Sequence, residues 1–192
     1  LGLRRMLTEW GIDIEKDNVK IGPVPGTGPD VSFGVQAAKV LAEGKIDGFW
    51  ANGMGSETAI REGVGKLLVD IRRGDEPKKA FNYTQPALMT TDALIEREPE
   101  TAAAAVRALV KTQKAIVADV SLTTKIGEKL FPGRDAAMIA DVVERDLPYY
   151  DPTVTPEFVV GMNEFMTDLG WLDGPVAYEK VVATQFCDLW KG

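Results

Sequence analysis

Short apolar runs alternate with amphipathic helical stripes through the first 74 residues, and a glycine ends most of these segments. Apolar residues recur at helical spacing from Leu3 to Trp10 and again from Val35 to Leu41. Runs typical of strands lie at 19–24, 46–51 and 67–71. Strands that alternate with helices usually form a parallel sheet covered by helices. This half of the chain therefore predicts an α/β fold with a parallel-rich sheet.

The second half changes in character after residue 76. One more strand is expected over 86–90, and the pattern that follows is helical. The helices expected there begin at Pro99 and run through Val117, then cover 121–130, 135–147, 156–169 and about 176–189. Pro99 suits a first helical turn because its missing N–H has no partner there. The sequence thus predicts an α/β lobe over 1–76 and a mainly helical part over 77–192.

Histidine is absent from the 192 residues, and Cys187 is the single cysteine. Serine–histidine and cysteine–histidine catalysis, histidine-bound zinc and an internal disulfide are therefore excluded. No pair of carboxylates is spaced for acid–base work, so we expect no catalytic residue, no metal and no cofactor. The net charge of −7 argues against nucleic acid, which needs a basic face.

The loop after the run at 46–51 is the first candidate ligand site. Trp50 could stack on a ligand, Asn52 could donate and accept hydrogen bonds, and Gly53 and Met54 follow in a small, uncharged turn. Ligands of open α/β sheets bind at the carboxyl ends of strands, which is where this loop is expected. Ser56 is expected to cap the next helix. A core tryptophan followed by an ordinary Asn-Gly turn is the alternative.

A second candidate loop contains Gly26, Thr27 and Gly28 between an expected strand and an expected helix. The dinucleotide-binding pattern is incomplete here because Val31 stands where its third glycine belongs. Backbone amides at a helix start can still hold an anion or a polar ligand atom. A tight loop without a ligand is the alternative.

The stretch VSFGVQAAKVLAEGKIDGFWANG resembles a recurring element of ABC-importer solute-binding proteins that bind nitrate, sulfonates, taurine or pyrimidine thiamine precursors. LRRMLTEWGID is similar to the helix that opens their second lobe. YTQPALMTTDALIEREPETAAAAVRALVKTQK resembles their return strand and long helix, and FMTDLGWLDGPVAYEKVV their closing helices. The likeness extends over nearly the whole chain.

This resemblance implies a type II periplasmic binding-protein fold, with 1–76 as the second lobe and 77–192 as the hinge return and helical part of the other lobe. It implies a periplasmic binding protein, not an enzyme, that holds a small organic molecule or oxoanion in an interlobe cleft. Tyr83 and Thr84, near the hinge, join the candidate ligand-binding residues. The implied partner is an ABC permease in the membrane. The N-terminal part of lobe one and a signal peptide are expected to lie outside these residues.

Two other functions fit the same features. The effector-binding domain of a LysR-type transcriptional regulator shares the two-lobed fold and would follow a DNA-binding segment. A helical interaction domain would pair with a second copy of the chain to form a homodimer. A small α/β enzyme that uses carboxylates or a cofactor is a third alternative.

Overall fold

The computed structural model describes residues 1–29, 31–75, 77–83 and 86–191, and 59% of the chain is helical. The α-helices are α1 (Gly2–Glu9), α2 (Phe33–Ala42), α3 (Gly53–Arg61), α4 (Lys78–Asn82), α5 (Asp92–Arg97), α6 (Pro99–Ala118), α7 (Ser121–Leu130), α8 (Gly133–Asp146), α9 (Pro156–Asp168) and α10 (Tyr178–Val181). Three 3₁₀ helices are η1 (Ile71–Arg73), η2 (Leu147–Tyr149) and η3 (Thr184–Leu189). No β-strand occurs within the ranges that the structure describes.

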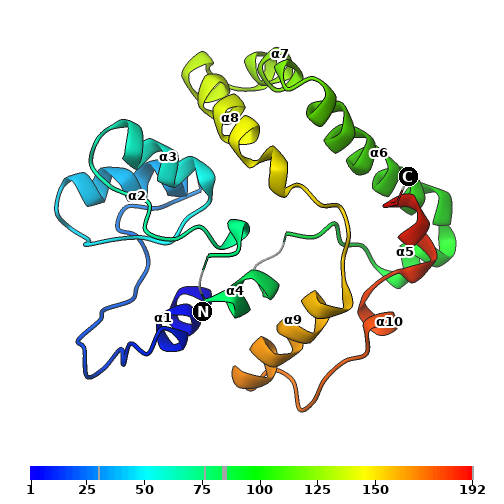
Figure 1. Ribbon diagram of the computed structural model, residues 1–192, viewed down its shortest axis with the longest axis horizontal. Helices are drawn as coiled ribbons and strands as arrows, with labels where there is room; N and C mark the ends of the chain where they lie inside the picture. Colours follow the sequence, from blue (N-terminus) through cyan, green and yellow to red (C-terminus); the bar gives the residue numbers. More distant parts are fainter. Residues whose placement is uncertain (30, 76, 84–85, 192) are drawn as a thin grey trace.

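The helices contact one another in a series of pairs, which can be followed around Figure 1. α2 packs against α3, α3 against α8, α8 against α7, and α7 against α6. α6 also contacts α5 and η3, so the last segment of the chain lies against the longest helix. α9 packs against α4 and α10, and α4 contacts α1 and η1. The start of the chain therefore meets a helix that lies about 150 residues later, through α4 and through the ion pair of Arg5 with Asp168.

Most of the expected helices are confirmed. α1 ends before Gly11 (φ +80°) and α2 before Gly44 (φ +66°), where glycine avoids the strain of a left-handed backbone. α6 begins at Pro99, and α7 and α9 lie within one residue of their expected bounds. The helix expected over 176–189 is instead broken into α10 and η3. The expected cap at Ser56 is wrong, because α3 begins earlier and Asn52 is its N-cap.

The expected parallel-rich α/β sheet is wrong. The segments 19–24, 46–51, 67–69 and 86–90 run without helix, but in the described part of the chain no backbone hydrogen bond joins any of them to another. A strand exists only through such a ladder, because its own backbone groups cannot satisfy one another. The type II periplasmic binding-protein architecture, which needs that sheet, is not seen.

Local chemistry explains why these apolar runs do not pair. Pro23 and Pro25 have no N–H to donate to a ladder. At the end of the third run, the amide of Asp70 donates to the Asp75 carboxylate (2.8 Å), and the chain turns at once into η1. An apolar run forms a strand only if a partner strand reaches it. At the end of the third run, a nearby side chain bonds to the backbone and the chain turns instead.

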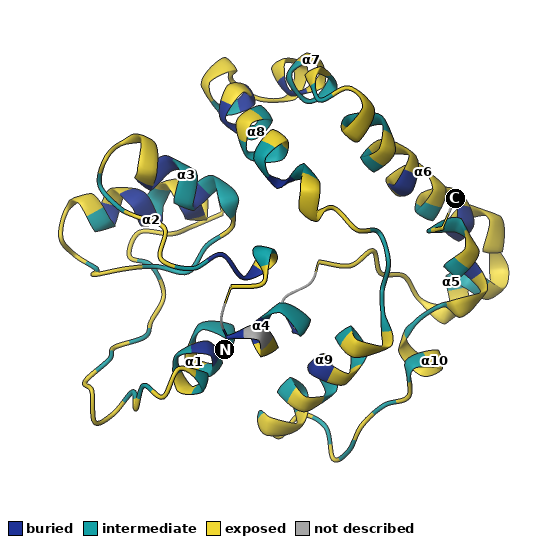
Figure 2. Ribbon diagram, viewed as in Figure 1, coloured by how far each residue is buried: buried dark blue, intermediate teal, exposed yellow. Residues whose placement is uncertain are grey.

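The hydrophobic core is divided into small clusters, seen as separate buried patches in Figure 2. One consists of Met6, Ile71, Ala80 and Tyr83, with Leu3, Trp50, Val69 and Phe165 packed against it. The other consists of Ala102, Ala103 and Phe186, with Ile95, Val106, Ala183 and Leu189 around it. Many of the buried side chains are alanines, so helices approach closely and each contact buries little apolar surface. The first cluster positions the candidate site.

Candidate functional site

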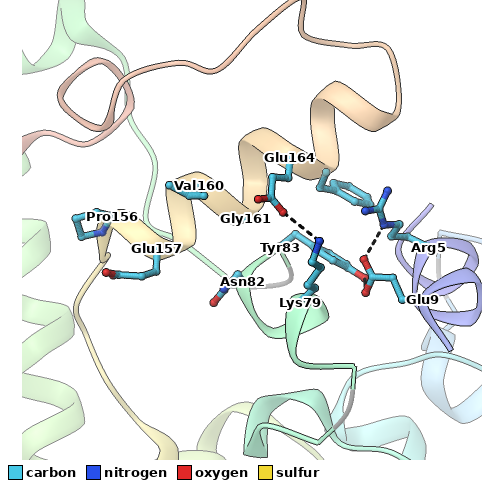
Figure 3. Close-up of a pocket in the computed structure, with 11 residues that line it drawn as sticks. Arg5, Glu9, Lys79, Asn82, Tyr83, Pro156, Glu157, Val160, Gly161 and Glu164 are labelled. Atoms are coloured by element: carbon cyan, nitrogen blue, oxygen red, sulfur yellow. Dashed lines mark hydrogen bonds and ion pairs between the residues drawn. The ribbon is translucent and has the colours of Figure 1, made fainter.

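A pocket of about 330 Å³ lies where α1, α4 and α9 meet (Figure 3). The residues that line it are Arg5, Glu9, Lys79, Asn82, Tyr83, Pro156, Glu157, Val160, Gly161, Glu164 and Phe165. This volume is at the small end of the range of pockets that bind organic ligands. Its walls combine apolar, aromatic and charged side chains, which is the usual make-up of such a site.

Gly161 sets how closely α4 and α9 approach. It is buried in the interior of α9, and a Cβ atom there would lie 2.3 Å from the Cβ atom of Asn82. Glycine inside a helix costs about 1 kcal/mol relative to alanine, so its presence needs a compensating contact. That contact is the crossing with α4, which brings Asn82 and Tyr83 to the pocket wall.

Tyr83 and Phe165 form the aromatic wall of the pocket. Their rings stack with centroids 4.6 Å apart and planes 10° from parallel. The Tyr83 hydroxyl donates to Glu9 at 3.5 Å, a long hydrogen bond. Burial, reinforced by the negative charge of Glu9, raises the pKa of Tyr83 to about 12. The phenol therefore stays protonated near neutral pH, where it can donate a hydrogen bond but cannot act as a base.

Arg5 is fully engaged by carboxylates. Its Nε donates to Glu9 Oε1 at 2.7 Å, and its Nη1 donates to Asp168. The hydrogen bond to Glu9, followed by the bond and charge of Asp168, raises the pKa of Arg5 against the opposing effect of burial. Both interactions are charge-assisted, and the two carboxylates already balance the charge of this guanidinium.

The other charged groups of the pocket are more open. Lys79 Nζ lies 3.6 Å from Glu164 Oε2, and both side chains are more than half exposed. Glu157, in the first turn of α9, is also exposed, and hydrogen bonds to its own amide and to Thr155 lower its pKa. Exposed ion pairs such as Lys79–Glu164 contribute about 0–1 kcal/mol, so a charged ligand can rearrange this rim at little cost.

The side chains of the pocket can hydrogen-bond to a ligand and contact its apolar parts. In the residues that the structure describes, no cluster of His, Cys, Asp and Glu is arranged to hold a metal ion. The pocket offers an aromatic face, an amide from Asn82 and carboxylates at its rim. Each can orient a bound molecule, and none is paired with a nucleophile.

The structure brings one predicted ligand residue to the pocket. Tyr83 lines it, and Trp50 packs against the same core cluster behind Tyr83 without lining the pocket itself. Thr84, predicted together with Tyr83, lies outside the described residues. The tryptophan is partly buried, which is the position of a core residue.

The loop residues Asn52, Gly53 and Met54 lie away from this pocket, at the start of α3. The Asn52 side chain accepts from the amide of Gly55 at 3.4 Å. A Cβ atom on Gly55 would lie 2.8 Å from the Cα atom of Gly34, so the two helices α2 and α3 touch backbone to backbone there. Helix packing accounts for the glycine at position 55.

Gly26, Thr27 and Gly28 also lie away from the pocket, in a turn before α2. Gly26 has φ +76°, and the Thr27 hydroxyl donates to the carbonyl of Val24 at 2.9 Å. Gln36 on α2 donates to the carbonyl of Pro25 at 2.8 Å. The Thr27 bond closes the turn, and the Gln36 bond holds the turn against α2.

A network of ion pairs lies beside the loop at Gly53. Asp70 and Asp146 are each 6% exposed, and both bind Arg72 and Arg73. Arg72 reaches the loop itself, because a Cβ atom on Gly53 would lie 3.3 Å from its Nη1. No basic residue is present in the loop sequence, so only the fold places one there. Its charge is already neutralised by the two aspartates.

The sequence reasoning missed most of the pocket. None of the α9 residues that line it, such as Val160 and Glu164, was among the predicted ligand-binding residues. One signal was available. A glycine in the middle of a helix, as at 161, indicates close approach of another backbone.

No protein-family model, no curated protein and no solved structure matches this chain. Within the described residues, no helix combines the length and the apolar character that crossing a membrane requires.

Proposed function

We propose that this chain binds a small organic molecule in the pocket between α1, α4 and α9, without transforming it. The observation that carries the proposal is the 330 Å³ pocket with the stacked Tyr83–Phe165 pair in its wall. This pair contributes apolar surface to the pocket wall, and neighbouring polar groups can orient a bound molecule. The absence of histidine from the sequence supports binding over catalysis.

The biological role that we propose for this binding is solute capture in the periplasm for an ABC importer in the membrane. Support for this role comes from the sequence resemblance described above. The structure contributes the pocket and not the two-lobed fold, so the two parts of the proposal stand separately. Ligand-dependent binding to membranes that contain a candidate permease would test the import role.

Filling the pocket tests the binding proposal. Val160 lies on the pocket side of α9 and is 56% exposed, so Val160→Trp adds an indole to the pocket without disturbing a buried contact. Val117→Trp on α6 is the matched control, because Val117 is 62% exposed and lies outside the pocket. The probes are 2-phenylethanol, 4-aminopyrimidine, taurine and nitrate. Their binding to each protein is measured by thermal unfolding and titration calorimetry.

We expect 2-phenylethanol or 4-aminopyrimidine to raise the Tm of the wild-type chain and of Val117→Trp. Val160→Trp should lose this response. Binding that is equal in both variants would place the ligand elsewhere. If none of the four probes raises the Tm, the binding proposal is wrong.

A homodimeric interaction domain is a second candidate, and one observation favours it. Leu68 is 89% exposed and Met89 85% exposed, and both lie in extended segments without a backbone partner in the described part of the chain. Exposed apolar side chains next to unpaired backbone groups are typical of surfaces that associate.

A further inference from the structure

The charges around the pocket are unbalanced, and this imbalance bears on the class of ligand. Its basic side chains are Arg5 and Lys79, and its acidic ones are Glu9, Glu157 and Glu164. Asp168 adds a fourth carboxylate through its bond to Arg5. Carboxylates therefore outnumber cations two to one around the pocket.

Neither basic side chain is well placed for an anionic ligand. Arg5 already holds two carboxylates, Glu9 and Asp168, so an added anion would leave one of these carboxylates unpaired. Lys79 is on the exposed rim beside Glu164. An anion approaching either group would also meet the negative charge of the remaining acids.

The start of α9 does not supply an anion site either. The N-terminus of a helix normally attracts negative charge. Here the Glu157 carboxylate already occupies that position, held by its own amide and by Thr155. Glu157 lines the pocket, and within the described residues no ion pair joins it to a basic side chain.

The wall along α9 has acidic ends and an apolar middle. Glu157 and Glu164 are seven residues apart, or about 10 Å along a helix, and therefore lie on one face. Val160 and Gly161 lie between them (Figure 3), and the stacked Tyr83 and Phe165 line the same pocket. A cation close to an aromatic face is attracted to it, while a hydrocarbon body fits the apolar middle.

We propose that the pocket selects an organic ammonium compound, a cation with an aromatic or aliphatic body, over neutral or anionic molecules of the same shape. This inference rests on the proposed binding function. The ammonium group hydrogen-bonds to Glu157 or Glu164, and the body of the ligand lies against Val160 and the aromatic pair.

Three probes of matched shape separate charge from shape: 2-phenylethylammonium, 2-phenylethanol and 3-phenylpropanoate. Titration calorimetry should give a Kd for the ammonium at least ten times lower than for the alcohol, and no saturable binding of the carboxylate. The ammonium affinity should also fall as salt is raised from 20 to 500 mM, whereas the alcohol affinity should not, because salt screens only the charged interaction.

Substitution of the acids assigns the selectivity to named residues. Glu157→Gln and Glu164→Gln should each weaken ammonium binding about three- to tenfold and leave alcohol binding unchanged. Glu96→Gln on α5, an exposed glutamate outside the pocket, is the matched control and should change neither affinity.

The possible results separate the two proposals. Equal binding of ammonium and alcohol would overturn the charge selectivity and leave the binding function in place. Tighter binding of the carboxylate would overturn the selectivity in favour of an anion. If no probe binds to the wild-type chain or to Val160→Trp, both proposals are wrong.

Discussion

Tyr83 belongs both to the hydrophobic core and to the pocket wall. Its side chain is 7% exposed, its ring stacks on Phe165, and its hydroxyl reaches Glu9 at the pocket edge. A phenol in this position must stay neutral, because its ionised form would be buried beside a carboxylate. The stability of the fold and the polarity of the pocket therefore depend on the same proton.

Tyr83 should make the free energy of unfolding depend on pH in the alkaline range. The folded pKa is about 12 and the ordinary value is 10.0, so the folded state holds this proton more tightly than the unfolded state. The resulting stabilisation is complete below pH 10 and is lost between pH 10 and 12. Denaturant unfolding of the wild-type chain and of Tyr83→Phe should show a steeper loss in the wild type across this window. If the free energy of unfolding falls equally with pH in the two proteins, Tyr83 is not the cause of the pH dependence.

Asp70 is the buried centre of the arginine network beside α3. Burial by itself would raise the pKa of Asp70, but hydrogen bonds from Arg72 and the charges of Arg72 and Arg73 outweigh it and lower the pKa. Asp70→Asn removes the negative charge and leaves both guanidiniums beside an amide. We expect the free energy of unfolding at pH 7 to fall by about 2–3 kcal/mol, as when one partner of a partly buried ion pair is lost.

Asp188→Asn is the control for this change. Asp188 is 93% exposed and pairs with Lys191 at 3.1 Å, so its loss should cost less than about 0.5 kcal/mol. Urea unfolding of both variants measures the difference. Equal losses in the two variants would show that the buried network adds nothing beyond an exposed pair. The Asp70 contribution should be complete above its ordinary pKa of 3.8 and should be lost as the pH falls from that value through the lowered folded pKa.

At the scale of elements, glycines decide which helices meet. Gly34 of α2 and Gly55 of α3 bring the two backbones into contact, and Gly161 of α9 does the same with α4. The helices α2 and α3 otherwise bury mainly small side chains. The pocket depends on the second contact, because α4 carries Asn82, with Tyr83 immediately after it, to the pocket wall.

Gly55→Ala should separate α2 from α3. The new Cβ atom would lie 2.8 Å from the Cα atom of Gly34, and a backbone atom cannot move aside as a flexible side chain can. We expect a loss of about 1–3 kcal/mol, typical of an overpacked contact. Gly133→Ala is the control, since a Cβ atom at the first residue of α8 meets nothing within 4 Å. Thermal unfolding measures both variants. An equal fall in Tm in the two would show that Gly55 is not held in a close backbone contact.

The whole molecule exposes apolar side chains where its extended segments run. Leu68 and Met89 are the most exposed large apolar residues, and the sheet that could have covered them does not form in the described part of the chain. The helices contact one another in successive pairs around small separate cores. A molecule built in this way has apolar surface available for a second copy.

We expect the wild-type chain to self-associate. Light scattering after size exclusion should give a mass that rises above the 20.9 kDa of one chain as concentration increases. The double variant Leu68→Lys and Met89→Lys should remain at the mass of one chain, because charge at these positions opposes apolar and backbone pairing. Val117→Lys, at an exposed valine on α6, is the control. A wild-type mass of 20.9 kDa at all concentrations would exclude association.

Helices were predictable from the sequence because their hydrogen bonds are local. An α-helix pairs each amide with a carbonyl four residues earlier, so an apolar stripe, a first-turn proline and a terminal glycine together set its bounds. This reasoning located α1, α2, α6, α7 and α9. It also identified Tyr83 through the family resemblance, and the structure places that residue in the pocket.

Tertiary structure decided the rest, because the remaining interactions join residues that are distant in the chain. An apolar run cannot show whether another strand will reach it, and the four runs expected to be strands remain unpaired with one another. The pocket joins Glu9 to Tyr83 and to Phe165, across more than 150 residues of sequence. Spacing along one segment predicts which side chains share a helix face, but only packing brings three helices together around one site.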